Sequence, residues 1–572
     1  MLKELQEALH RAAQKLDETT PYEVARSISF SELAEHGDYS SSLSLKLAKI
    51  LKKNPFEVAK LLKQEIEKLK IREIEKIEVA PPGFLNFTLS KKSLLKLLTN
   101  ILKGPGEWGQ SKVGAGKIVI AEYFQLNIAK PPHVGHLRSA VIGDAIKRML
   151  VACGYHAVSD THVGDWGTQF GILLLQYKKL PSKERDIFLS DIATSARAYT
   201  EASLRLDENP EELERAKEEF AKLEKGDSES RIIWEKLVAN SMRELEKSAK
   251  RLGLLPFDEH RGESFYEDKM GDIVELALKK GVAQKTSEGA VVVDLSADKL
   301  NEAVLIKSDG ASTYLLRDLA TIQYRKQQWN FWKNLYVVDV RQSHHFQQVF
   351  RVAELLGFEG VGSSEHIEFG FMSSKEGALS TRKGTAISLD AVLDEARERA
   401  LKVIREKNPD LENPEEIAEI VGLGALKYFD LSHHRRSNVV FDWDSALSFE
   451  GDTGPYLQYT HARLKSILRK VNVTPVDTPP EVEIDELEHR LLVTALRLPE
   501  VVEEALVDFT PHTLAQYLYK LATLANEFYH SHPVVQESNE AKKQFRTLLI
   551  TGVALTLSEG LSLLGIVAPE EM

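Results

Sequence analysis

The feature that most constrains this chain is a strand-like segment that leads, through a short polar motif, into an amphipathic helical pattern. The strand candidate spans residues 117–123 (KIVIAEY), and the motif spans residues 127–138 (NIAKPPHVGHLR). In the helix that follows, four apolar residues recur four positions apart on one face, namely Leu137, Val141, Ala145 and Met149. A strand joined to a helix in this way is the unit of a doubly wound parallel sheet, in which ligands bind beyond the carboxyl ends of the strands.

Further strand-like runs alternate with helical patterns downstream of this unit. They cover residues 155–159, 290–295, 303–307, 335–340 and 366–371. Between about residues 180 and 287 the pattern changes to charged helices, which predicts a helical region inserted into the sheet domain. We therefore expect a parallel-sheet, Rossmann-like domain over residues 115–395, with these runs as its further strands.

The regions on either side of this domain have different patterns. With 572 residues the chain is long enough for about three or four domains. Residues 1–105 combine helical patterns with a short strand-like segment, and the glycine-rich stretch 103–117 predicts a linker. Residues 396–572 are almost entirely helical in pattern. The expected fold class is therefore multidomain α/β: a small N-terminal α/β module, the sheet domain with its helical insertion, and an all-α C-terminal bundle.

Two imidazoles flank a glycine where the first helix of the sheet domain begins. His133 and His136 stand on either side of Gly135. The N-terminus of a helix offers backbone N–H donors and a positive dipole end, which favour a phosphate group, and imidazoles can reach negative charge that develops there. Two solvated histidines in a loop are an equally good interpretation of the bare motif, so the motif alone leaves its role open.

Further motifs lie downstream of the histidine motif. They are 164–171 (GDWGTQFG), 314–318 (YLLRD), 336–342 (YVVDVRQ), 379–384 (LSTRKG) and 449–463 (FEGDTGPYLQYTHAR). Together with H-V-G-H, this set resembles the class I aminoacyl-tRNA synthetases, and specifically the arginyl-tRNA synthetase family, over essentially the whole chain. The resemblance implies a ligase that attaches L-arginine to its tRNA, tRNA(Arg), through arginyl-adenylate, with release of AMP and pyrophosphate.

The same resemblance implies the substrates and partners. ATP would be used with Mg²⁺ as a substrate, and no protein-bound metal is expected. The tRNA would be contacted at its elbow by the N-terminal module and at its anticodon by the C-terminal bundle, and we expect a monomer. In this family the activation of arginine usually depends on bound tRNA, so formation of the adenylate by the enzyme alone is not assumed.

An arginine pocket needs carboxylates, because a guanidinium and a carboxylate pair in bidentate fashion. By resemblance, the residues that bind arginine are Glu122, Asn127, Tyr314, Asp318 and Gln342. Tyr314 and Asp318 are four positions apart on an expected helix, so both side chains can enter one pocket. The alternatives are a core tyrosine and a solvated helix acid. Glu122 closes an apolar strand, and a buried acid at that position requires a partner.

The phosphate loop of the family is altered in this chain. The class I pattern K-M-S-K-S corresponds to residues 378–382 (ALSTR), so both lysines are missing. By resemblance, ATP binding and catalysis fall to Lys130, His133, Gly135, His136, Ser380, Thr381, Arg382 and Lys383. Lys130 and Lys383 are the leading candidates for the missing positive charge, with Lys375 and Arg382 behind them. A solvated loop lysine is the alternative for Lys383.

The helical C-terminus carries aromatic and basic residues that suit single-stranded RNA, whose unstacked bases stack on rings and lie near cations. By resemblance, Tyr459, Tyr529 and the last residue, Met572, contact the anticodon. The expected basic faces comprise residues 433–436 (HHRR), His461, Arg463, Lys465, Arg469 and Lys470. A helix with a solvated basic face and core tyrosines is the alternative.

Composition narrows the remaining possibilities. The single cysteine, Cys153, rules out an intrachain disulfide and fits a reducing compartment. The N-terminus lacks the apolar stretch of a signal peptide, and the longest apolar run, residues 548–567, contains Ser558 and Glu559, so we expect a cytoplasmic protein without a membrane span. A net charge of −12 means that RNA contacts require local basic patches.

Two rival functions stay open at this point. One is a class I ligase for a different amino acid, which would make Glu122 and Asp318 bystanders. The other is a non-catalytic RNA-binding or regulatory relative, which the altered 378–382 loop slightly favours and the intact histidine pair disfavours.

Overall fold

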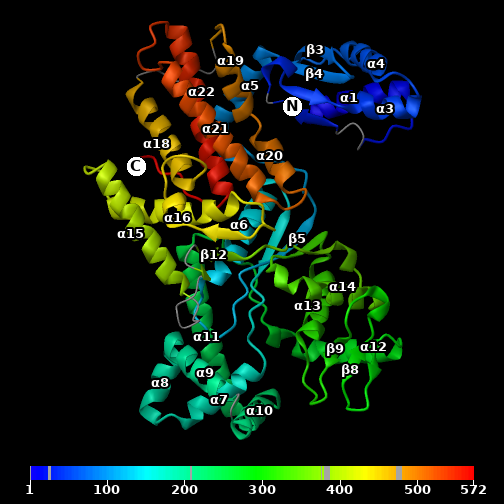
Figure 1. Cartoon of the computed structure of the whole chain (residues 1–572), viewed down its shortest axis with the longest axis vertical. Coiled ribbons are helices and arrows are strands. Elements are labelled where there is room, and N and C mark those ends of the chain that lie inside the picture. Colours follow the sequence, from blue (N-terminus) through cyan, green and yellow to red (C-terminus); the bar gives the residue numbers. More distant parts are fainter. Residues whose placement is uncertain are drawn as a thin grey trace.

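The computed structural model describes residues 2–22, 27–31, 33–206, 209–374, 377–378, 387–471 and 480–572. Three regions follow one another along the chain, and Figure 1 shows the N-terminal module beside the C-terminal helices, above the parallel-sheet region. The predicted fold class is confirmed: the structure combines an N-terminal α/β module, a parallel sheet with inserted helices and a helical C-terminal region.

The N-terminal module is a four-stranded antiparallel sheet with helices. Its elements are α1 (Leu2–Leu16), β1 (Ile28–Phe30), β2 (Tyr39–Ser41), α3 (Leu43–Leu51), α4 (Pro55–Lys68), β3 (Ile74–Ala80), β4 (Phe84–Leu89) and α5 (Lys91–Lys103). The strand order is β1-β2-β4-β3. The helical pattern breaks before Pro55 because Asn54 caps α4 by accepting the N–H of Phe56 and proline occupies the first turn.

The parallel sheet lies at the centre of the molecule. It is formed by β5 (Ile118–Glu122), β6 (His156–Asp160), β10 (Lys333–Tyr336) and β11 (Ser364–His366), in the order β11-β10-β5-β6. All three pairings are parallel. The helix α6 (Leu137–Ala152) joins β5 to β6, as the opening pattern predicts. Parallel strands place their carboxyl ends at one edge, so the segments after β5, β6 and β10 lie close together.

Two of the predicted strands form, but outside this sheet. Residues 291–293 form β8 (Val291–Val293) and residues 303–306 form β9 (Ala303–Ile306), which pair antiparallel with each other in a separate sheet of order β7-β8-β9, with β7 at Gln284–Lys285. Their assignment to the parallel sheet is therefore wrong. The physical reason is the length of the connection: parallel neighbours need a crossover of about a dozen residues or more, and only residues 294–302 separate these strands.

The helices that follow β6 form two lobes of the central region, together with the second sheet. The helices are α7 (Thr168–Lys179), α8 (Ser182–Ser190), α9 (Ile192–Leu206), α10 (Pro210–Glu224), α11 (Ser228–Arg251), α12 (Met270–Lys279), α13 (Tyr314–Trp329) and α14 (Ser343–Leu356). Figure 1 shows α7–α10 at the lower left, and α12–α14 with β8 and β9 at the lower right. The short helix η4 (Glu263–Lys269) precedes α12.

The C-terminal region is helical apart from a small sheet. Its helices are α15 (Leu389–Lys407), α16 (Pro414–Leu431), α17 (Trp443–Ala446), α18 (Gly454–Lys470), α19 (Glu486–Ala495), α20 (Leu498–Ala505), α21 (Pro511–Ser531) and α22 (Glu540–Leu563). The strand β12 (Met372–Ser374) pairs with β13 (Gly377–Ala378) and with β14 (Val439–Phe441). Among the described helices, none combines the length and apolar character that a bilayer crossing requires.

A buried arginine fastens α6 to the C-terminal region. Arg138, in the first turn of α6, forms an ion pair with Asp430 of α16, with 2.8 Å between Nε and Oδ1. The Arg138 guanidinium also donates to the carbonyls of Gly370 and Ser437 at 2.6 and 3.1 Å. Gly370 and Ser437 precede β12 and β14. The helix that begins at the H-x-G-H motif and the strand pair next to the predicted phosphate loop are thus held by one side chain.

Candidate active site

The H-x-G-H motif forms a short 3₁₀ turn, η3 (Val134–His136), that opens α6. His133 Nδ1 accepts the N–H of Gly135 at 3.1 Å, and His136 Nδ1 accepts the N–H of His133 at the same distance. The two imidazole rings lie 3.8 Å apart between centroids. A Cβ on Gly135 would stand 2.8 Å from His133 Cε1, so the glycine allows this ring to close over the turn. The pair is therefore ordered by the backbone of its own turn.

Both imidazoles are electrically neutral near pH 7. Burial, together with the charges of His133 and Lys130, lowers the pKa of His136 to about 3. Burial and Lys130 also lower the pKa of His133. Lys130 itself lies with its Nζ 4.8 Å from the centroid of the Tyr199 ring on α9. The positive charge at this edge of the sheet thus comes from Lys130 and the helix end, while the histidines offer neutral N–H donors.

Several carboxylates lie at the carboxyl ends of the parallel strands. Glu122, at the end of β5, is 3% exposed, and its Oε2 lies 2.6 Å from Nη2 of Arg325. Its Oε1 accepts a hydrogen bond from Gln125 at 3.2 Å. Arg325 on α13 is completely buried and also pairs with Asp160 at 2.8 Å. The partner that a buried Glu122 requires is therefore an internal arginine.

Asp318, two helical turns before Arg325 on the same face of α13, lies beside two histidines. His345 Nε2 lies 2.5 Å from Asp318 Oδ2, and His162 Nε2 lies 3.9 Å from Asp318 Oδ1. His345 belongs to α14 and His162 to the segment after β6. Asp318 is thus a partly buried, partnered carboxylate at the edge of the sheet, close to the end of β6.

Glu263 is a further acid of this cluster that the sequence analysis missed. Its carboxylate pairs with Arg317 of α13 at 2.8 Å. Burial raises the pKa of Glu263 to about 7, although Arg317 and His162 oppose the rise. The sequence did hold a signal for Arg325, because it follows Asp318 by seven residues and so lies on the same face of α13. No local sequence pattern pointed to Glu263, His162 or His345.

The remaining residues predicted to bind arginine lie at the rim. Asn127 is exposed, and its strand-like segment is joined to the loop after β6 through a hydrogen bond from Ile128 N to the carbonyl of Gly164. Tyr314, at the start of α13, is 60% exposed, with the Arg317 guanidinium 5.2 Å from its ring centroid. Gln342 is exposed at the end of η6 (Val340–Gln342), after β10. These side chains are available to a ligand, whereas the acids are already partnered.

Part of the predicted phosphate site lies outside the described residues. This holds for Ser380, Thr381, Arg382, Lys383 and Lys375. The strands β12 and β13 precede residues 380–383, and His133 forms a backbone bridge with Ser388 just after them. The chain that follows the loop is therefore anchored at the histidine pair.

Two of the predicted anticodon residues, Tyr459 and Met572, line a cleft in the C-terminal region, and the third, Tyr529, contacts Arg463 of that cleft. The cleft, of about 730 Å³, is lined by Lys407, Asn408, Phe449, Tyr456, Tyr459, Arg463, Asn526, His530 and Met572, among others. The Arg463 guanidinium lies 4.7 Å from the ring centroid of Tyr459 and 5.1 Å from that of Tyr529. Aromatic rings and a cation thus occupy one concave surface.

Several residues of the predicted basic faces are structural instead. Arg435 is buried and donates to the backbone carbonyls of Glu368 and Phe509. His461 is buried and bonded to the carbonyl of Pro569. Lys465 is paired with Glu570. The prediction that Arg435 and His461 belong to a basic face is wrong, because both side chains are buried, whereas Lys465 stays partly exposed in its ion pair.

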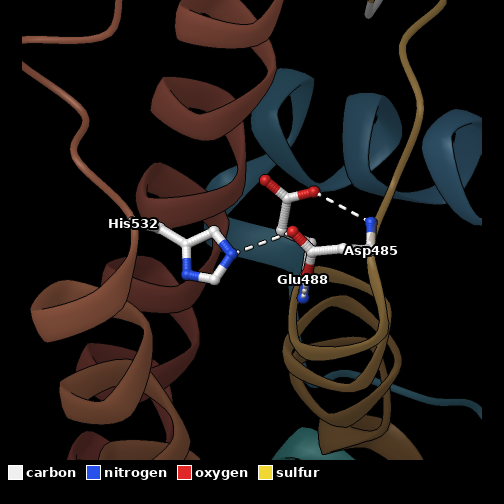
Figure 2. A group of neighbouring side chains, drawn as sticks. All are labelled: Asp485, Glu488 and His532. Atoms are coloured by element: carbon white, nitrogen blue, oxygen red, sulfur yellow. Dashed lines mark hydrogen bonds and ion pairs between the residues drawn. The ribbon is translucent and has the colours of Figure 1, made fainter.

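One cluster of metal-type ligands occurs among the described residues, and Figure 2 shows it: Asp485, Glu488 and His532. Asp485 and Glu488 form a capping box at the start of α19, and His532 Nε2 lies 2.8 Å from Asp485 Oδ2. The buried carboxylate of Glu488 also pairs with Lys542 and Arg546. These contacts account for the cluster as a helix cap held by two cations.

Comparisons with known proteins agree with this architecture along the whole chain. Residues 97–443 match the family model of the class I (R) tRNA synthetase catalytic domain, residues 457–572 match the DALR anticodon binding domain, and residues 2–89 match the arginyl tRNA synthetase N-terminal domain.

Individual relatives are similar over nearly their full length. The arginine–tRNA ligase of Enterococcus faecalis is 39% identical over 557 residues, covering 97% of both chains, and that of Alkaliphilus metalliredigens is 37% identical over 94% of both. The structure of Thermus thermophilus arginyl-tRNA synthetase superposes with a TM-score of 0.82 at 28% identity, with all of each chain covered. The prediction of an enzyme that attaches arginine to tRNA for protein synthesis is confirmed, and its rivals are not supported. The chain belongs to the arginyl-tRNA synthetase family of class I aminoacyl-tRNA synthetases.

Proposed function

We propose that the acids at the carboxyl edge of the parallel sheet select arginine by charge. The observation that carries this assignment is a charge imbalance. Four carboxylates (Glu122, Asp160, Glu263 and Asp318) face two guanidiniums, Arg317 and Arg325. Among the described residues, the remaining negative charge is matched only by the titratable imidazoles of His162 and His345. An uncompensated charge in a largely buried site is costly. A substrate that brings a buried cation removes part of that cost.

Within this pocket, Asp318 is the direct partner of the substrate guanidinium. Glu122 shares its carboxylate with Arg325, so its contribution to arginine binding is mainly the negative field at the end of β5. The exposed side chains of Asn127, Tyr314 and Gln342 surround the mouth of the pocket and hold the α-amino and α-carboxyl groups of arginine in place. Arginine would thus extend from the rim toward Asp318.

The histidine pair and Lys130 serve the phosphates of ATP. Activation requires the substrate carboxylate to attack the α-phosphate of ATP while pyrophosphate leaves, which calls for positioning and for positive charge at the phosphates. Gly135 leaves room for the nucleotide at the start of α6. Lys130 supplies a charge close to both imidazoles, and the 380–383 segment (Ser380, Thr381, Arg382 and Lys383) supplies the remaining donors. Mg²⁺ would arrive with ATP.

The C-terminal cleft would hold the anticodon of tRNA(Arg). Tyr459 and Tyr529 offer rings for unstacked bases, Arg463 offers a cation between them, and Met572 lines the same cleft. The N-terminal module would contact the elbow of the tRNA. We also propose that the enzyme works as a monomer in the cytoplasm, with module boundaries at 1–105, 115–395 and 396–572.

The pocket assignment is tested with the Asp318→Asn variant, in which one charged partner of the guanidinium is lost. Charge-assisted hydrogen bonds contribute about 1.5–3 kcal/mol, so the KM for arginine should rise about 10- to 100-fold. The measurement is arginine-dependent ATP–pyrophosphate exchange, with and without tRNA(Arg). The matched control is Asp339→Asn, a carboxylate of the same edge that pairs with the exposed Arg341.

Two different results would contradict two different parts of this proposal. An unchanged KM for arginine in Asp318→Asn would remove Asp318 from the pocket. Exchange supported by other amino acids but not by arginine would contradict the selection of arginine itself.

A further inference from the structure

His162 occupies the centre of the acidic cluster without a role in the fold that accounts for it. It follows β6, in a left-handed backbone conformation with φ of 40°. Its side chain is 10% exposed, and its ring lies 5.6 Å from that of Tyr266. Nδ1 is buried and has no hydrogen-bond partner among the described residues. A buried imidazole nitrogen without a protein partner can hydrogen-bond to a bound ligand.

The groups that face His162 come from every neighbouring element. Glu122 ends β5, Asp160 ends β6, Asp318 and Arg325 belong to α13, and Glu263 belongs to η4. Asp165 also lies near, but it accepts both the N–H and the hydroxyl of Ser264. Carboxylates outnumber guanidiniums in this set. The imidazole of His162, together with that of His345 on Asp318, can therefore carry a compensating positive charge when no substrate is bound.

The position of His162 relative to Asp318 strengthens this interpretation. His345 lies against one oxygen of the Asp318 carboxylate at 2.5 Å, and His162 lies 3.9 Å from the other oxygen. The second oxygen accepts no hydrogen bond from His162 at that distance. A guanidinium that reached Asp318 would approach this oxygen, and it would then stand directly beside the imidazole.

We propose that His162 carries a proton in the empty pocket and releases it when the guanidinium of arginine takes its place beside Asp318. This inference rests on the arginine pocket proposed above. One cation enters and one proton leaves to solvent, so the net charge of the pocket stays the same and neutral His162 can accept a hydrogen bond from the substrate. His162 is thus a residue that helps determine specificity, because a substrate without a buried cation would not displace the proton.

The electrostatics support the protonated state. Burial alone would lower the pKa of His162, but the carboxylates of Glu122 and Asp318 outweigh it and raise that pKa. Substrate guanidinium would push the pKa down again. Below the raised pKa, arginine must compete with a bound proton, so the dissociation constant for arginine should fall as the pH rises and become constant once His162 is neutral.

The test is isothermal titration calorimetry of the full-length protein with L-arginine, in buffers of different ionisation enthalpy and at pH values from 5.5 to 8.5. About one proton should be released per arginine bound at the lower pH values, and the dissociation constant should fall by up to about tenfold per pH unit there. In His162→Gln, proton release should largely disappear and arginine should bind more tightly than to wild type at low pH. A residue with only a structural role would weaken binding at every pH instead.

The matched control is His532→Gln, which removes a histidine paired with an aspartate far from the pocket. This variant should release protons as the wild type does. The absence of proton release in the wild type would overturn the inference even if the His162 variant does not fold. Undiminished release in His162→Gln would also overturn it and would assign the proton to His345 or Glu263.

The same titrations separate this inference from the pocket on which it rests. If Asp318→Asn binds arginine as the wild type does, the pocket assignment is wrong. If Asp318→Asn loses arginine while the wild type binds it without releasing a proton, the pocket stands and the role of His162 is wrong.

Discussion

Arg463 shows how much a single side chain contributes to the C-terminal cleft. Its guanidinium lies between the rings of Tyr459 and Tyr529, and its Nη1 donates to Asn526 at 2.7 Å. Asn526 in turn donates to Tyr456 and Thr460. The arginine therefore holds two rings in place for bases and is itself held by a polar network.

Removal of the Tyr459 ring tests whether this cleft binds a base of the tRNA. Stacking of one base on an aromatic ring contributes about 1–3 kcal/mol, so Tyr459→Ala should weaken tRNA(Arg) binding about 5- to 100-fold. Tyr459→Phe keeps the ring and should bind tRNA nearly as the wild type does. The measurement is tRNA affinity by fluorescence anisotropy, with arginine affinity as the second readout. Equal tRNA affinities for the Ala and Phe variants would show that this ring does not stack on a base.

Sequence patterns predicted the position of the histidine motif at the start of α6, but they did not reveal the buried charged residues of the site. The histidine pair and Gly135 are visible locally because their spacing and the following helix fix their geometry. Arg325 and His162 are different, because a buried charge is defined by partners that lie far away in the chain. Arg325 meets Glu122 across about 200 residues, and no local pattern contains that pairing.

At the scale of elements, α6 and α16 depend on the Arg138–Asp430 pair. Burial raises the pKa of Asp430, and Arg138 opposes that rise. Removal of one partner of a buried ion pair costs about 3–5 kcal/mol, because the other partner remains buried without compensation. Since Arg138 also holds the backbone next to β12 and β14, its loss should displace this strand pair, of which β12 precedes the phosphate loop.

The expected result for Arg138→Lys is a higher KM for ATP, with little change in the affinity for arginine. Lysine keeps the charge but cannot reproduce the forked contacts to Asp430 and the two carbonyls. Pyrophosphate exchange gives the KM, and chemical denaturation gives the stability. Arg546→Lys is the control, since it weakens a similar buried pair with Glu488 inside the C-terminal bundle. A KM for ATP that changes equally in both variants would argue against a specific role of Arg138.

Element types were predicted more reliably than their partners. The segment from β5 to β6 follows its sequence pattern because one local unit contains both strands and the helix. The strands β8 and β9 have a similar composition, yet they pair with each other and not with the central sheet. Hydrophobic patterning determines whether a segment forms a strand, while the length and path of the connections determine which strand it meets.

At the scale of the whole molecule, the N-terminal module docks on the helices of the C-terminal region. Glu500 accepts hydrogen bonds from the Tyr39 hydroxyl at 2.6 Å and from the backbone N–H of Leu2 at 3.0 Å. Arg497 lies with its guanidinium 3.9 Å from the ring centroid of Phe30. Asp38 pairs with His489. A proposed elbow-binding module is thus set directly against the proposed anticodon-binding region.

Glu500→Ala should loosen this docking. The buried hydroxyl of Tyr39 would lose its partner, at a cost of about 1–3 kcal/mol. Trypsin should then cleave the segment 104–117 faster than in the wild type, as followed by mass spectrometry. Glu503→Ala removes only the exposed pair with Lys3, which contributes about 0–1 kcal/mol, and should leave the cleavage rate unchanged. Equal rates in all three proteins would show that Glu500 does not hold the module.

The internal guanidinium of Arg325 limits how this enzyme could be redesigned. A protein engineer who wished to replace arginine by its uncharged analogue citrulline would first think of neutralising the pocket acids one by one. Glu122 and Asp160 are poor targets, because both pair with the buried guanidinium of Arg325 and the loss of either acid would remove one of its two partners. Asp318 is the acid that can be exchanged without a matching change in Arg325. Selectivity can therefore be altered at one position of this cluster, while the other two acids and their arginine would have to evolve together.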